Sequence, residues 1–180
     1  MRVKKIMVAL LIGLPTAGLA APSDPDKTTG DILQFAVPAA GLAVAVLKGD
    51  DEGEAQWLRN TTASFLATQV LKVAFNSTSW GQRPNGGQHS FPSGHVAFAA
   101  SGAAFLTERY GWQYGLLGWA ATCYVAYSRV DEHEHHWRDV AVGAGLSYGI
   151  SKLFVTPETA TQLAPIIGPG FIGLRWQRSF

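Results

Sequence analysis

The sequence predicts an all-α protein, an up-down bundle of about five core helices preceded by a signal-like apolar N-terminal segment. From residue 31 to residue 155, apolar residues recur with helical periodicity in runs longer than ordinary strands. Turn-forming residues interrupt these runs and leave segments of helical length. A chain of 180 residues with a formal net charge of +1 suits one domain, and no nucleic-acid partner is expected.

The first 21 residues are typical of a signal peptide or an N-terminal anchor. A basic start at residues 1–5 precedes an apolar stretch at 6–14 and small residues at 17–20. We expect this segment to direct the chain to the bacterial cell envelope, with residues 22–30 as a polar linker. The inner membrane, with a periplasm-facing active site, and the periplasm itself are the two expected locations.

Five helices are expected in the helical domain, residues 31–155. Their predicted ranges are 31–47, 54–75, 93–110, 112–129 and 138–155. Alanine and glycine dominate the third and fifth, which allows neighbouring helices to approach closely. Residues 156–180 contain three prolines and are expected to form an irregular tail, in which 170–176 alternates like a short strand.

Opposing features bear on membrane association. The apolar runs, of about fourteen to seventeen residues, fall just short of the spanning length. The second helix also carries Arg59 and Lys72, which are unusual in a membrane span. However, the first helix is apolar over residues 32–47 and needs more cover than a small soluble bundle provides. We therefore expect membrane association, with a soluble bundle as the alternative.

Three short patterns fall at one end of the predicted bundle. They are Lys72 with Arg83-Pro84, then Phe91-Pro92-Ser93-Gly94-His95, then Ser128-Arg129 with His135 and Asp139. The first follows the second helix, the next opens the third helix, and the last joins the end of the fourth helix to the start of the fifth. Because helix direction alternates in an up-down bundle, all of these positions lie at the same end.

The cationic residues of these patterns suit a phosphoryl group. Arg83 and Arg129 can each bind two phosphate oxygens, and Lys72 adds a point charge. For either arginine alone, the alternative is a solvated side chain or an ion pair with Glu132 or Glu134. The three cations together predict a phosphate site.

The start of the third helix and two histidines complete the predicted site. Ser93 and Gly94 place free backbone N–H groups and the positive end of the helix dipole before an anion. His135 and Asp139 are four residues apart, so Asp139 can fix the tautomer of His135 and leave its other nitrogen free to attack phosphorus. His95 would protonate the departing oxygen. An ordinary capped helix and a polar loop are the alternatives for these segments.

No metal and no other cofactor are expected. Residues 131–136 form a rival metal site, but they lack a ligand spacing such as H-E-x-x-H. Cys123 is the only cysteine, which excludes a cysteine-based zinc site, and we expect it in the core. His89, His133 and His136 have no assigned role.

The three patterns resemble those of the type 2 phosphatidic acid phosphatase superfamily, which includes lipid phosphate phosphatases, bacterial class A acid phosphatases and vanadium haloperoxidases. That family has Lys, six residues, Arg-Pro; then Pro-Ser-Gly-His; then Ser-Arg, five residues, His, three residues, Asp. The last two patterns match without gaps at residues 92–95 and 128–139. Ten residues separate Lys72 from Arg83, however, and Asn76 occupies the family lysine position. We interpret Lys72 as the family lysine, followed by a longer loop.

The resemblance implies a metal-independent phosphatase that hydrolyses a monoester or pyrophosphate through a phosphohistidine. It implies His135 as the nucleophile, Asp139 as its orienter and His95 as the general acid. The implied phosphate-binding residues are Lys72, Arg83, Ser93, Gly94 and Arg129. The expected substrate is a membrane lipid phosphate. A soluble periplasmic phosphatase of small phosphate esters is the first alternative, and a vanadium haloperoxidase or a non-catalytic envelope protein are further ones. The sequence identifies no protein partner.

Overall fold

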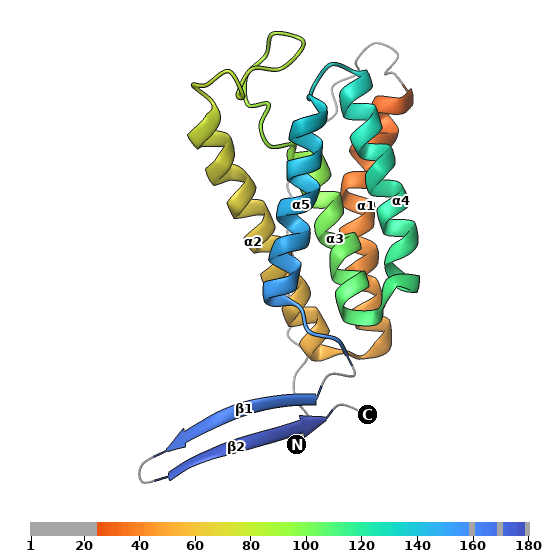
Figure 1. The fold of residues 1–180 in the computed structure, drawn as a ribbon. Coiled ribbons are helices and arrows are strands. Elements are labelled where there is room, and N and C mark those ends of the chain that lie inside the picture. The colour runs from red at the N-terminus through yellow and green to blue at the C-terminus, as the bar shows by residue number, and fades with distance from the viewer. Residues whose placement is uncertain (1–24, 159–160, 169–170, 179–180) are drawn as a thin grey trace.

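The computed structural model describes residues 25–158, 161–168 and 171–178, with side chains over 25–158. Five α-helices form an up-down bundle (Figure 1), which confirms the predicted fold class. The helices are α1 (Pro25–Lys48), α2 (Asp51–Phe75), α3 (Gly94–Tyr110), α4 (Trp112–Asp131) and α5 (Trp137–Phe154).

The two ends of the predicted helical domain differ from expectation. α1 begins at Pro25 rather than Asp31, so residues 25–30 are helical and not part of a linker. A proline and an acidic residue, Asp26, suit the first turn of a helix, which explains the earlier start. The predicted signal segment lies outside the described residues.

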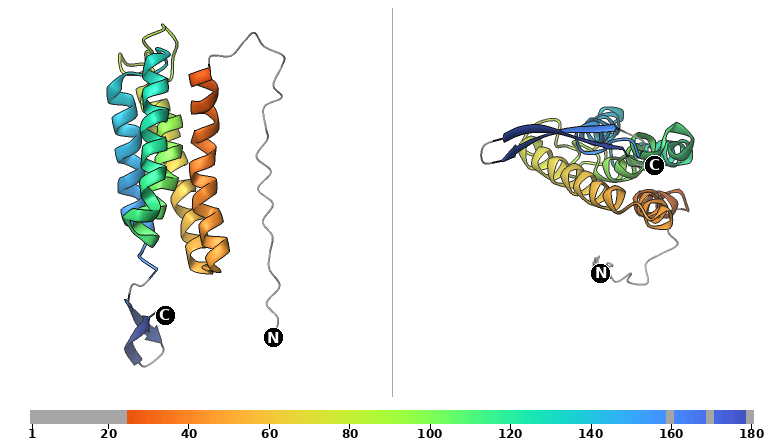
Figure 2. Two further views of the ribbon diagram at one scale, coloured as in Figure 1. Left: turned by 90° about the vertical axis from the view of Figure 1, so that its right-hand side faces the viewer. Right: turned by 90° about the horizontal axis from the view of Figure 1, so that it is seen from below.

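The C-terminal segment is more regular than the irregular tail that we expected. β1 (Thr161–Gly168) and β2 (Phe171–Arg178) pair antiparallel, with Thr161 opposite Arg178 and Gly168 opposite Phe171. β2 contains most of the segment whose alternation predicted a strand. The pair lies beyond one end of the bundle, and the α2–α3 loop lies at the other end (Figures 1 and 2).

α3 is the central helix of the bundle and contacts all four others. Its small side chains make this possible: Ala99, Ala100 and Ala103 are fully buried. A Cβ atom at Gly102 would lie 2.4 Å from the Cα atom of Pro38, so only glycine lets α1 approach the α3 backbone this closely. The predicted role of the small residues in helix packing is thereby confirmed.

Buried polar side chains link α2 and α5 to α3. The Asn60 amide donates to the Ser101 carbonyl at 3.0 Å and accepts from the Ser151 hydroxyl at 2.8 Å. The Ser147 hydroxyl donates to the Ala97 carbonyl at 2.7 Å. These hydrogen bonds satisfy buried polar groups and fix how α2 and α5 sit beside the N-terminal half of α3, where the predicted site begins.

The outer faces of α1, α2, α4 and α5 carry large exposed apolar side chains. They include Ile32, Leu47, Leu66, Val70, Val73, Leu116, Leu117 and Leu153. Among the described helices, α1 alone is long and apolar enough to cross a membrane by length and composition. Cys123 is exposed on α4, so its expected core position is wrong: the inner face of that helix is formed by residues such as Thr122 and Val125.

Candidate active site

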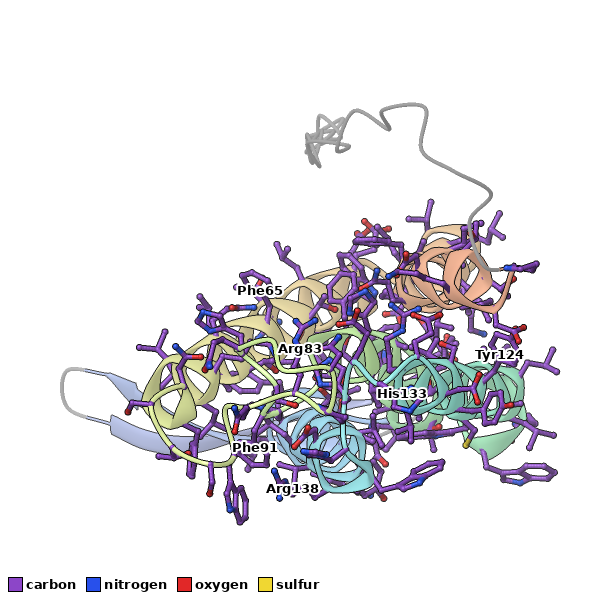
Figure 3. All side chains as sticks on the ribbon, turned by 90° about the horizontal axis from the view of Figure 1, so that it is seen from above. Phe65, Arg83, Phe91, Tyr124, His133 and Arg138 are labelled. Carbon is purple, nitrogen blue, oxygen red and sulfur yellow. The ribbon has the colours of Figure 1, made fainter. Side chains whose placement is uncertain are left out.

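The predicted site residues all lie at the end of the bundle where α2 and α4 finish and α3 and α5 begin (Figure 1). Viewed from this end, Arg83 lies over the interior of the bundle (Figure 3). The alternation of helix direction therefore brings the three sequence patterns together, as expected from an up-down topology.

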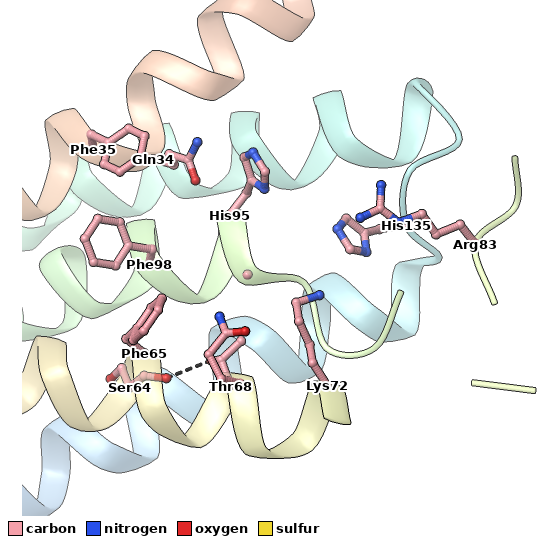
Figure 4. Close-up of a pocket in the computed structure, with 12 residues that line it drawn as sticks. Gln34, Phe35, Ser64, Phe65, Thr68, Lys72, Arg83, His95, Phe98 and His135 are labelled. Atoms are coloured by element: carbon pink, nitrogen blue, oxygen red, sulfur yellow. Dashed lines mark hydrogen bonds between the residues drawn. The ribbon is translucent and has the colours of Figure 1, made fainter. Parts of the chain in front are cut away.

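A cavity of about 300 Å³ opens at this end, between α1, α2 and α3 (Figure 4). Five of the eight predicted residues line it: Lys72, Arg83, Gly94, His95 and His135. Three phenylalanine rings line its other end. The cavity is thus cationic at one end and apolar at the other.

Lys72 lies beside the start of α3. Its Nζ donates to the His89 carbonyl at 2.7 Å, and its Cε would lie 3.5 Å from a Cβ atom at Gly94. Asn76, at the family lysine position, instead accepts from the His89 N–H at 3.0 Å. Lys72 and Asn76 therefore both bond His89 in the loop. Of these two side chains, Lys72 is the one that brings a positive charge to the cavity.

The long α2–α3 loop is packed against the helix ends. The ring of Trp80 lies 5.7 Å from that of Phe75 and 4.9 Å from that of Phe91, measured between centroids. The guanidinium of Arg138 lies 5.3 Å from the centre of the Trp80 ring. These contacts fix the loop that carries Arg83 and explain how the added residues keep the arginine over the cavity.

Both arginines have acidic partners. Arg83 forms an ion pair with Glu134 and donates from Nε to the Gln88 carbonyl at 2.9 Å. Arg129 is buried and donates from Nη2 to Glu132 at 3.3 Å and to the Lys27 carbonyl at 3.1 Å, and from Nη1 to Asp31 at 3.0 Å. The ion pairs that were the alternative to phosphate binding are therefore present. A guanidinium has five N–H donors, so Glu134 and the Gln88 carbonyl orient Arg83 without using all of them. Arg129, by contrast, already bonds two carboxylates, a carbonyl and the Ser128 hydroxyl.

Asp31, in α1, is a site residue that the sequence analysis missed. Its Oδ1 atom lies 3.0 Å from Nη1 of Arg129 and 3.0 Å from Nε2 of His95. Because an ionised carboxylate only accepts hydrogen bonds, His95 donates to Asp31 through Nε2. No signal in the sequence pairs α1 with these residues, which follow it by 64 and 98 positions.

Asp139 is buried beside His135, but it does not form the predicted hydrogen bond. The distance from Oδ2 of Asp139 to Nδ1 of His135 is 3.8 Å. That oxygen accepts instead from the Ser90 hydroxyl at 2.6 Å and the His136 N–H at 2.9 Å. The i, i+4 argument requires both residues to be helical, whereas α5 begins at Trp137, so His135 precedes the helix.

His135 is buried and electrically neutral at pH 7. Burial, together with the positive charges of Lys72 and Arg83, lowers the pKa of its imidazole to about 3, although the charge of Asp139 opposes this shift. Within residues 25–158, its Nδ1 atom has no hydrogen-bond partner. A neutral imidazole has a free lone pair, which is the form that can attack phosphorus.

Ser93 is fully buried at the N-cap of α3. Its N–H donates to the Asp139 carbonyl at 2.9 Å, while its hydroxyl makes no capping bond and has no partner in the part of the chain that carries described side chains. An unpaired buried hydroxyl costs free energy, so a ligand oxygen at this position would be stabilising.

Over the described residues, no group of three or more His, Cys, Asp or Glu side chains could hold a metal ion. The positive charge of the site comes from Lys72, Arg83 and Arg129 together with the start of α3.

A family model described as the PAP2 superfamily matches residues 57–159, which is more than half of the chain and includes all three motifs. The chain belongs to the PAP2 superfamily. The resemblance of the motifs is thereby confirmed, and this PAP2 protein is a phosphatase.

Two curated relatives of this PAP2 protein come from Helicobacter pylori. It is 26% identical to a lipid A 1-phosphatase over 171 residues, which cover 86% of this chain and 89% of the relative. It is 28% identical to a lipid A 4'-phosphatase over 135 residues, which cover 71% of this chain and 68% of the relative. No solved structure matches the chain.

Proposed function

We propose that this PAP2 protein hydrolyses the phosphate monoester or pyrophosphate of a membrane lipid through a phosphohistidine, without a metal. The observation that carries the proposal is the meeting of a buried neutral histidine with Lys72 and Arg83 at the cationic end of a cavity whose other end is apolar.

Binding of the phosphoryl group precedes the reaction. Lys72 and Arg83 line the cavity. Arg129 does not line it, but it is linked to the cavity residue His95 because both contact the same oxygen of Asp31. The hydroxyl of Ser93 and the first N–H groups of α3, from Gly94 onward, add donors. These groups stabilise the negative charge on the equatorial oxygens, which is the main task of a phosphoryl-transfer site.

The first chemical step is attack by His135. Its Nδ1 side faces Asp139, so Nε2 forms the bond to phosphorus as the bond from phosphorus to the ester oxygen breaks. His95 is held through Nε2 by Asp31 and gives a proton from Nδ1 to the departing oxygen. The products of this step are the alcohol and a phosphohistidine.

The second step is hydrolysis of the phosphohistidine. The oxygen of a water molecule attacks phosphorus, and its proton passes to His95, which is neutral after the first step. Inorganic phosphate leaves, and the nitrogen lone pair of His135 is restored. Asp139 acts indirectly, because it fixes Ser90 and the start of α5 and so positions the segment that carries His135.

The exposed apolar surface of the bundle and the names of the relatives both support a lipid substrate in the bacterial envelope. Apolar side chains cover the outer faces of four helices, an arrangement that would favour association in water but suits a bilayer. The relatives are named for lipid A, which is therefore the first substrate to test. We place the protein in the inner membrane with a periplasm-facing active site. A soluble phosphatase of small esters and a vanadium haloperoxidase are the remaining alternatives.

Turnover by detergent-purified protein tests the proposal. We expect release of inorganic phosphate from lipid A, full activity in excess chelator because the cations are side chains, and inhibition by vanadate, which mimics the phosphoryl group in transfer. Peroxide with halide should give no product. Equal specificity for lipid A and p-nitrophenyl phosphate would favour the soluble alternative. Loss of activity in chelator that zinc restores would instead make residues 133–136 a metal site.

A further inference from the structure

The half of the cavity that lies away from the phosphate-binding residues has no role in the chemistry described so far. Its walls are the rings of Phe35, Phe65 and Phe98, interspersed with polar side chains (Figure 4). The rings of Phe35 and Phe98 are in contact, with centroids 5.6 Å apart. Phe35 is 48% exposed and Phe65 is 51% exposed, so this end opens toward the outside of the bundle between α1 and α2.

Ser64 is the polar residue that stands out in this apolar half. It is 1% exposed and lines the cavity, yet among the described residues its hydroxyl has no hydrogen-bond partner. The neighbouring Thr68 hydroxyl is satisfied, because it donates to the Ser64 carbonyl at 2.7 Å. A buried hydroxyl that lacks a partner, on a residue that lines a cavity, is stabilised when a ligand supplies one.

The spacing along α2 places this hydroxyl relative to the phosphate. Ser64, Thr68 and Lys72 are four residues apart in turn, so they share one face of the helix, and all three line the cavity. Eight residues correspond to a rise of about 12 Å along the helix axis. A substrate whose phosphate contacts Lys72 therefore brings the atoms about 1 nm from phosphorus to Ser64.

We propose that Ser64 is a specificity-determining residue, whose hydroxyl hydrogen-bonds a hydroxyl, amide or ester group in the organic part of the substrate. The inference rests on the proposed function and narrows it to amphiphiles that carry such groups within the first nanometre from phosphorus, as an acylated sugar phosphate does. Prenyl and alkyl phosphates have only hydrocarbon there and leave Ser64 unpaired.

The chain offers a matched pair of variants. Ser64→Ala removes the hydroxyl of a residue that lines the cavity. Thr61→Val removes a second buried hydroxyl, one turn earlier on α2, which likewise has no partner among the described residues but belongs to a residue that does not line the cavity. The probes are N-dodecanoylglucosamine 1-phosphate and farnesyl phosphate, and the measurement is kcat/KM from phosphate release in detergent.

For Ser64→Ala we expect kcat/KM to fall about 3- to 10-fold on the acylated sugar phosphate, the usual effect of one neutral hydrogen bond, and to stay unchanged or rise on farnesyl phosphate. Thr61→Val should match wild type on both. Equal effects of Ser64→Ala on the two substrates, no effect on either, or a wild-type preference for farnesyl phosphate would overturn the inference while leaving a lipid phosphatase. If wild type released phosphate from neither of the two lipids, the result would count against the proposed function itself.

Discussion

The two histidines of the site lie on the same cavity but in different electrostatic surroundings. His95 donates from Nε2 to the carboxylate of Asp31 at 3.0 Å. His135 is 3.8 Å from the nearest carboxylate oxygen, and its closest charged neighbours include Lys72 and Arg83. Burial and Arg129 lower the pKa of His95, but the hydrogen-bonded carboxylate of Asp31 opposes that shift, whereas burial, Lys72 and Arg83 lower the pKa of His135 to about 3 without a hydrogen-bonded carboxylate to oppose them.

This difference assigns the two chemical roles without reference to motif position. A nucleophile needs a lone pair and must be neutral, and a general acid needs a proton to give. Pairs of titratable groups whose surroundings separate their proton affinities are typical of acid and nucleophile assignments. His135 therefore suits attack on phosphorus, and His95 suits protonation of the leaving oxygen.

Replacement of His135 should have the largest effect. If its nitrogen forms the bond to phosphorus, nothing in the leaving group can substitute for it, and His135→Ala should lose at least about ten-thousand-fold in kcat on every substrate. The assay compares lipid A with p-nitrophenyl phosphate, and rapid quenching with labelled substrate detects the phosphoenzyme. A labelled phosphoenzyme that persists in His135→Ala would reverse the two assignments.

Replacement of His95 should give a loss that depends on the leaving group. On a lipid or alkyl phosphate, His95→Ala should lose about a hundred- to ten-thousand-fold, the usual contribution of a general acid. The loss on p-nitrophenyl phosphate should be much smaller, because that phenolate leaves without a proton. Since His95 also serves the second step, the variant should accumulate labelled enzyme. Equal losses on both substrates would argue against the assignment.

The contrast between the two histidines also shows how far the sequence could predict the site. The helices, their alternation and the gathering of the motifs at one end follow from local periodicity and topology, and all are confirmed. Which carboxylate hydrogen-bonds each histidine was harder to predict. Spacing pointed to Asp139 for His135, but α5 starts after His135, and helix ends are set by capping contacts such as that of Asp139 itself.

Asp31 could not be predicted because it belongs to another helix. Its contact with His95 depends on how α1 packs against α3, which the close approach at Gly102 determines. α1 also begins six residues before the predicted start at Asp31, which makes Asp31 an interior position of the helix. Packing between helices, unlike periodicity within one, leaves no regular pattern in a single sequence.

Removal of the Asp31 charge should have a moderate effect that tests the contrast directly. Asp31→Asn keeps a hydrogen-bond acceptor but removes the negative charge that raises the pKa of His95. The basic limb of the pH profile of kcat/KM on a lipid phosphate should therefore move to lower pH, and kcat/KM near neutral pH should fall about tenfold. Glu132→Gln is the matched control, because Glu132 accepts from Nη2 of Arg129, the same guanidinium that Asp31 contacts through Nη1. The same shift in both variants would attribute the effect to Arg129.

The smallest expected effect is on the pH dependence of stability. Because the pKa of His135 falls from 6.5 in the unfolded chain to about 3 in the folded protein, the unfolded chain binds an extra proton between these values. The stability that comes from keeping His135 neutral in the folded protein is therefore complete above about pH 6.5 and is lost as the pH falls toward 3. In detergent, the Tm of wild type should therefore drop more between pH 7 and pH 4.5 than the Tm of His135→Asn. His95→Asn should change that slope less, since Asp31 partly offsets the lowering of the pKa of His95 by burial and Arg129. A greater flattening in His95→Asn than in His135→Asn would mean that His95, and not His135, is the histidine held neutral by its surroundings.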